Sequence, residues 1–100
     1  MLSMPVTPRQ FTIRPLAPDD LATVVAIDAA SEGRTRREYI ERRLRAAQRE
    51  PALHAQFAAV DGSSVVGFIL ARVLAGEFGV RRRALRLELM GVSAEHRSGG

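Results

Sequence analysis

Cysteine is absent from this chain of 100 residues, and so is lysine. The first absence excludes disulfides, thiolate metal sites and a cysteine nucleophile, so any chemistry must use oxygen, nitrogen or backbone groups. The second means that all fifteen basic residues are arginines. Guanidinium groups pair bidentately with phosphate, which favours a phosphate or nucleic-acid ligand. Because the arginines are spread along the chain, however, we favour a coding bias and do not expect nucleic acid as the partner.

Long apolar runs are missing as well. No segment approaches the ~20 apolar residues of a membrane span, and the N-terminal stretch MLSMPVTPRQF lacks both the basic start and the apolar run of a signal peptide. We therefore expect a cytoplasmic protein with no membrane partner, in which residues 1–10 are an N-terminal extension. Hydrophobic residues make up 46% and charged residues 26%, which predicts one small folded body.

The first half of the chain predicts a strand and two helices. Residues 11–15, FTIRP, alternate between apolar and polar side chains as a half-buried strand does. Residues 17–30 open with a proline and two aspartates, which suit a helix N-terminus, and continue with an apolar stripe. Residues 35–50 begin with a capping box, Thr35 and Glu38, and contain a second stripe. The side chains expected to face the core are Leu21, Val24, Val25, Ile27, Ile40, Leu44 and Ala47.

The second half predicts three strands. Residues 54–60 and 65–74 flank the turn sequence DGSS and form a hairpin. The second of these strands is almost wholly apolar, so we expect it to be central and covered on both faces. Residues 75–83 form a loop that leads to the strand 84–92, ALRLELMGV. The predicted fold class is α+β: an N-terminal strand, two helices, and a three-stranded antiparallel meander.

The last strand carries an irregularity. Its alternation predicts three leucines on one face, Leu85, Leu87 and Leu89, and two charged residues on the other, Arg86 and Glu88. The pattern breaks at Met90 and Gly91. A glycine inside a strand at such a break indicates a β-bulge that leaves backbone groups unpaired.

This order of elements, followed by VSAEHRSGG, resembles the N-terminal part of the GNAT superfamily of acyl-CoA-dependent N-acyltransferases. Arg97, Ser98, Gly99 and Gly100 match the first four places of the family's signature, Arg or Gln, two residues, Gly, one residue, Gly or Ala. The stretch FTIRPLAPDDLATV resembles the family's first strand and helix. The resemblance covers residues 11–100 and implies an incomplete fold whose C-terminal part is absent.

The resemblance also implies a cofactor site. Backbone N–H groups in a glycine turn ahead of a helix can cradle a pyrophosphate, so the segment from Arg97 through Ser98 and Gly99 to Gly100 is expected to bind coenzyme A. Family members use the bulged strand to bind the acyl-pantetheine arm, and the matching residues here are Met90, Gly91 and Val92.

Roles toward the acceptor follow from the same resemblance. Glu88 matches a position where many members carry an acidic residue that helps to deprotonate the acceptor amine, usually through water. The alternative is a solvated Glu88 paired with Arg86. Glu32, Arg34 and Phe78 lie in segments where members bind the acceptor. The spacing around His54 and His96 suggests neither a metal site nor a triad, and no metal is expected; Tyr39 should pack within its helix.

The function that the resemblance implies is transfer of an acetyl group from acetyl-CoA to a primary amine, of a small molecule or a peptide, by direct attack. This N-terminal fragment is expected to be inactive alone. Its open strand edge predicts a homodimer, formed by strand pairing or by burial of the leucine face. The alternatives are a non-catalytic dimerising module and an arginine-rich binder of nucleic acid.

Overall fold

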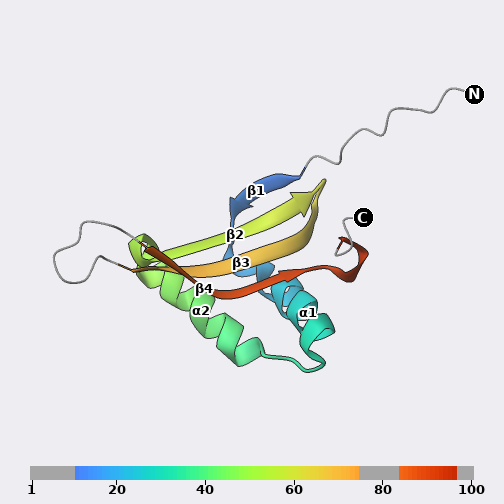
Figure 1. The fold of residues 1–100 in the computed structure, drawn as a ribbon, viewed down its shortest axis with the longest axis horizontal. Helices are drawn as coiled ribbons and strands as arrows, with labels where there is room; N and C mark the ends of the chain where they lie inside the picture. Colours follow the sequence, from blue (N-terminus) through green and yellow to red (C-terminus); the bar gives the residue numbers. More distant parts are fainter. Residues whose placement is uncertain (1–10, 75–83, 97–100) are drawn as a thin grey trace, which may run out of the picture.

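The computed structural model describes residues 11–74 and 84–96. Within these ranges one antiparallel sheet has the strand order β1-β2-β3-β4, and two helices lie together on one of its faces (Figure 1). The elements are β1 (Thr12–Pro15), α1 (Leu21–Glu32), α2 (Arg37–Arg49), β2 (His54–Asp61), β3 (Ser64–Leu74) and β4 (Ala84–Val92). Three short 3-10 turns complete them: η1 (Pro18–Asp20), η2 (Pro51–Leu53) and η3 (Ala94–His96). The predicted α+β class is confirmed, and β1 extends the meander by pairing with β2.

The core lies between the helices and the sheet. Val24 of α1, Ile40 of α2 and Leu70 of β3 are the largest fully buried side chains. They belong to the apolar stripes and to the apolar strand that the sequence predicted, because a stripe with helical period needs one sheet face to cover it. A charged residue anchors the start of α1. Both carboxylate oxygens of Asp20 accept hydrogen bonds from Arg14 at 2.8 Å, and the pair holds the pKa of Asp20 below its usual value.

The segment between the helices departs from the predicted capping box. Helix α2 begins at Arg37, and its first-turn amide groups receive no bond from a Thr35 side chain, so that prediction is wrong. The physical reason is a competing ion pair. The guanidinium of Arg36 donates to both carboxylate oxygens of Asp28, with Nε at 2.9 Å from Oδ2, and Asp28 is buried at the end of α1. This contact holds the residues before α2 in a non-helical turn.

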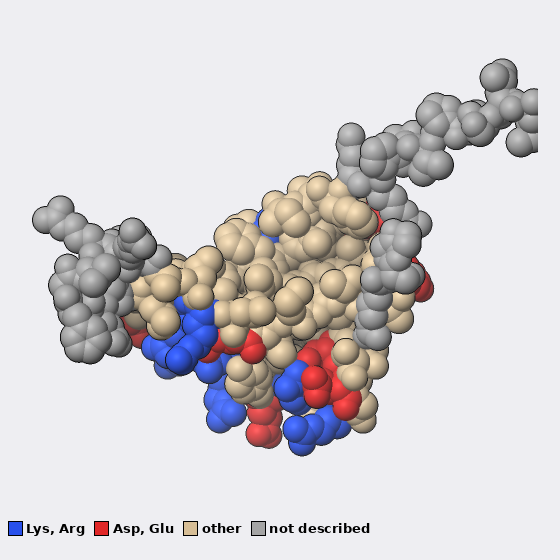
Figure 2. Space-filling model, viewed as in Figure 1, with Lys and Arg blue, Asp and Glu red and all other residues tan. Residues whose placement is uncertain are grey.

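The hairpin of β2 and β3 forms as predicted. Gly62 sits in its turn with φ 63°, a left-handed conformation that glycine adopts without strain. Strand β3 lies between β2 and β4, as predicted, and the described helices lie on one face of the sheet, so cover of its other face stays a prediction. The opposite face is a shallow apolar hollow, lined among others by Ile13, Phe57, Ile69 and Met90. Figure 2 shows this contrast: charged atoms gather over the helices, while the sheet side is largely uncharged.

Candidate functional site

The candidate site is built on β4, an edge strand that contains a bulge. Leu70 of β3 pairs with Leu89, whereas Ala71 pairs with Leu87, so Glu88 is the extra residue between two normal pairs. The sequence placed the bulge at Met90 and Gly91, and that position is wrong. The bulge lies earlier because the register change lets Leu89 reach the core.

The bulge places the leucines of β4 on two different faces of the sheet. Leu85 is 66% exposed and Leu87 is 53% exposed, both on the open face, while Leu89 packs against the core under the helices. The prediction that all three leucines share a face is therefore wrong. A strand side chain changes face at every residue, and one inserted residue shifts the phase for everything beyond it.

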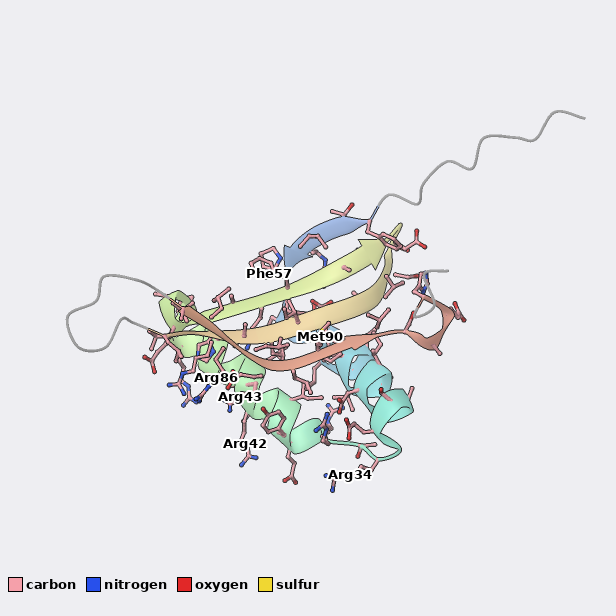
Figure 3. All side chains as sticks on the ribbon, in the orientation of Figure 1. Arg34, Arg42, Arg43, Phe57, Arg86 and Met90 are labelled. Atoms are coloured by element: carbon pink, nitrogen blue, oxygen red, sulfur yellow. The ribbon has the colours of Figure 1, made fainter. Side chains whose placement is uncertain are left out.

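Glu88 lies between β4 and α2. Its side chain is only 6% exposed, and its Oε2 lies 2.8 Å from Nη2 of Arg43 on α2. The Arg43 guanidinium also lies over the Tyr39 ring, 5.3 Å from its centroid, in a cation–π contact. The alternative pairing of Glu88 with Arg86 is not formed. Figure 3 labels Arg43 on α2 and Arg86 on β4.

One oxygen of the Glu88 carboxylate is buried without a hydrogen-bond partner in the described part of the chain. This atom is Oε1. Leaving a buried carboxylate oxygen unpaired is costly, and such atoms commonly bind a water molecule or a ligand group. Arg43 thus binds one oxygen of Glu88, and the other oxygen is available to bind a water molecule or a ligand group.

The last three residues of β4 pair with β3 in regular register. Met90 pairs with Ile69, Gly91 with Phe68, and Val92 with Gly67. Glycine is needed at position 91 for packing: an added Cβ would lie 2.7 Å from the Phe68 ring and 3.1 Å from a methyl group of Ile27. The absence of a side chain therefore lets α1 approach the end of β4 closely.

Beyond β4 the chain enters η3, which leads toward Arg97. Ser93 Oγ lies 2.7 Å from Nδ1 of His96, and Nε2 of His96 lies 3.4 Å from Oδ2 of Asp61 in the hairpin turn. The sequence predicted no partner for His96, whereas the fold places Ser93 within hydrogen-bond distance of its ring and the Asp61 carboxylate nearby. A further contact, edge-on with the Phe11 ring, fixes this turn against the start of β1.

The predicted acceptor residues lie apart from β4. Glu32 ends α1 and forms an ion pair with Arg36 at 3.4 Å, and Arg34 is exposed in the segment between the helices (Figure 3). Phe78 lies outside the described residues, as do the four residues of the predicted coenzyme A segment, Arg97, Ser98, Gly99 and Gly100.

Residues 11–74 and 84–96 contain no cluster of three or more His, Asp or Glu side chains arranged to hold a metal ion. In the same ranges, no helix has the length and apolar character needed to cross a membrane.

Comparison of the sequence with family models finds no match, and no curated protein matches it. The fold, in contrast, matches solved structures. A possible acetyltransferase from Clostridium difficile 630 superposes with a TM-score of 0.68 at 17% identity, over 87% of this chain and 60% of that one. The ribosomal-protein-alanine N-acetyltransferase from Brucella melitensis biovar Abortus 2308 gives 0.67 at 20% identity, over 91% and 62%. This is the GNAT fold.

The fold also matches an aminoglycoside acetyltransferase. The aminoglycoside antibiotic 6'-N-acetyltransferase from Acinetobacter baumannii gives a TM-score of 0.61 at 18% identity, over 91% of this chain and 63% of that one. The chain thus spans about three fifths of the length of these structures and corresponds to the N-terminal portion of the GNAT fold.

Within this GNAT fold, the structure places Glu88, Met90, Gly91 and Val92 on one edge strand, as predicted, and separates them from Glu32 and Arg34. Arg43 was missed as a partner of Glu88. The spacing of Tyr39 and Arg43, four residues apart on a helix, indicates a contact between those two, but no sequence signal links α2 to β4.

Proposed function

We propose that this chain is the N-terminal part of an acetyltransferase that moves an acetyl group from acetyl-CoA to a primary amine. The observation that carries the proposal is the bulged edge strand β4, which presents a buried carboxylate at Glu88 and then runs through Gly91 and η3 into the sequence RSGG. The similarity to solved acetyltransferases supports the same reaction class.

In the proposed reaction, the bonds and the proton change as follows. Acetyl-CoA supplies the acyl carbon; a new bond forms between that carbon and the amine nitrogen while the carbon–sulfur bond breaks and the thiolate leaves. Glu88 takes the proton lost by the amine. Because Oε1 of Glu88 is buried, that proton travels through a bound water and not by direct contact. A positioned base of this kind contributes roughly 10²–10⁴ in rate.

Backbone groups of Met90, Gly91 and Val92 are proposed to hold the acyl-pantetheine arm along the outer side of β4, which borders no further strand among the described residues. Arg97 and the Ser98–Gly100 amides are proposed to cradle the pyrophosphate. Glu32, Arg34 and Phe78 are proposed to contact the acceptor, a small molecule or peptide amine. No metal takes part in this scheme, and a cytoplasmic location suits it.

Coenzyme A binding tests the proposal without requiring turnover. In a titration followed by amide NMR and calorimetry, coenzyme A is expected to shift the signals of Val92, Ser93 and His96 and to bind saturably. Changing Gly100 to valine should remove the binding because a side chain there blocks close approach of the pyrophosphate. Gln48→Ala, an exposed change on α2, is the matched control and should bind as the parent does.

Each result of these experiments tests a different part of the proposal. No signal shift up to millimolar coenzyme A, with the chain folded by circular dichroism, contradicts the proposal. Equal binding by the Gly100→Val and parent chains contradicts the assignment of the glycine segment. A complete domain that transfers acetyl groups but is unaffected by Glu88→Gln contradicts only the role of Glu88.

A dimerising module is the second candidate, favoured by the open apolar face. We propose that two copies associate through the β4 edge and its exposed side chains, Leu85, Leu87 and Met90. Leu89 cannot take part, since it packs inward. Dimerisation is compatible with catalysis and does not depend on it.

Sedimentation velocity at micromolar concentration should therefore detect a dimer. Leu87→Glu should shift the chain to monomer by placing a charge in the apolar contact, whereas Ala22→Glu, an exposed change on α1, should not. A parent chain that sediments only as a monomer rules out this association.

A further inference from the structure

Three nitrogen-bearing side chains form a row across the sheet at the end where β4 begins. His54 of β2 pairs directly with Arg72 of β3, and Arg72 pairs directly with Arg86 of β4. Residues paired in this way point to the same face, with Cβ atoms about 4.5–5.5 Å apart. The fold therefore brings together three residues that are distant in the sequence. We call them the basic row.

The basic row lies on the helix side of the sheet. Leu70, two residues before Arg72 on β3, is fully buried beneath the helices, and side chains two apart on a strand share a face. Arg72 and Arg86 are nevertheless exposed. Figure 2 shows basic side chains gathered near the end of the sheet at which Figure 3 labels Arg86.

The charges of the basic row are unbalanced. Among the described residues, neither Arg72 nor Arg86 forms an ion pair, and the nearby carboxylate of Glu88 is already bound to Arg43. Like charges placed directly opposite one another destabilise an antiparallel pair. The Nδ1 atom of His54 is in addition buried without a hydrogen-bond partner. Two guanidinium groups and an imidazole thus occupy adjacent register positions on one face of the sheet, and neither guanidinium has an ion-pair partner among the described residues.

We propose that the basic row binds a phosphate group. A phosphate dianion balances the two arginine charges, and each planar guanidinium can donate two parallel hydrogen bonds to it. Arg86 and Val92 are six residues apart on β4, or about 20 Å along the strand. The group is either a phosphate monoester or the phosphodiester backbone of a nucleic acid. The proposal does not depend on the acetyltransferase reaction.

Arginine side-chain NMR tests it. Inorganic phosphate is titrated into the full chain at constant ionic strength, and the Nε–H signals of Arg72 and Arg86 are expected to shift saturably and together. Arg72→Gln and Arg86→Gln should each weaken the binding by about tenfold or more, the loss of one charge-assisted contact. Arg45→Gln on α2 removes the same charge at an exposed site and should change it less than about twofold.

Thermal melting gives a second measurement. Phosphate should raise the melting temperature of the parent chain, and Arg86→Gln should be the more stable chain in phosphate-free, low-salt buffer because it removes the like-charge pair. Titration with a short oligouridylate tells whether the bound phosphate group is a monoester or part of a phosphodiester backbone. If it shifts Arg72 and Arg86 while inorganic phosphate does not, the row binds a phosphodiester backbone. If neither probe shifts these signals, or if Arg45→Gln weakens binding as much as Arg86→Gln does, the proposal is wrong.

Discussion

Replacing Arg36 with methionine is expected to lower the free energy of unfolding by about 3 kcal/mol, the cost of leaving a buried carboxylate without its partner. The side chain of Asp28 is only 3% exposed, and both of its oxygens accept hydrogen bonds from Arg36. Without the guanidinium, both buried oxygens of Asp28 lose their hydrogen-bond donors. Urea unfolding followed by circular dichroism at pH 7 measures the loss.

Two further variants separate this effect from a general loss of charge. Arg45→Met removes an exposed arginine that pairs with Glu41, and a surface pair of this kind contributes less than about 1 kcal/mol. The double change Asp28→Leu with Arg36→Met should recover much of the stability, because no unpaired charge then remains. If Arg36→Met costs no more than Arg45→Met, the pair does not hold the segment between the helices in the way described.

Truncation of Leu70 to alanine is the second large effect. Leu70 is fully buried between β3 and the helices, so the change removes apolar burial and leaves a cavity, at a cost of about 2–5 kcal/mol. A small domain has little stability to spare, so the variant is expected to unfold at clearly lower urea or to be partly unfolded in buffer.

Leu87→Ala is the matched control because Leu87 lies on the neighbouring strand and is 53% exposed on the opposite face. At concentrations where the chain is monomeric, it should change the free energy of unfolding by less than about 0.5 kcal/mol. Leu89→Ala should fall between the two, since Leu89 is partly buried against the core. Equal effects of the Leu87 and Leu89 changes would mean that the bulge at Glu88 does not exist.

The elements of this chain could be read from its sequence because their signals are local. The stripes of residues 21–27 and 40–44 have the helical period, the apolar run 65–74 is bounded by a turn, and each pattern was confirmed. The resemblance to GNAT proteins rested on the order and spacing of such elements, and the fold bears it out. The capping box failed because Asp28 of the preceding helix binds Arg36 in the same turn.

The side chains around Glu88 could not be read in the same way. The alternation in β4 showed that an irregularity was present, but the break in the pattern put it at Met90 and Gly91, which is wrong. Pairing with β3 put the extra residue at Glu88, and packing of Leu89 against the core accounts for that choice. The partner of Glu88 then came from α2, which approaches β4 only in the folded chain.

The sequence by itself determined the strand, the two helices, the hairpin and the edge strand that leads into the glycine segment, since each depends on neighbours a few residues apart. Tertiary structure alone decided which face each leucine of β4 occupies, that Arg43 binds Glu88, and that His54, Arg72 and Arg86 form one row. These depend on register and on the placement of helices against the sheet. Such contacts join distant residues, and no local period encodes them.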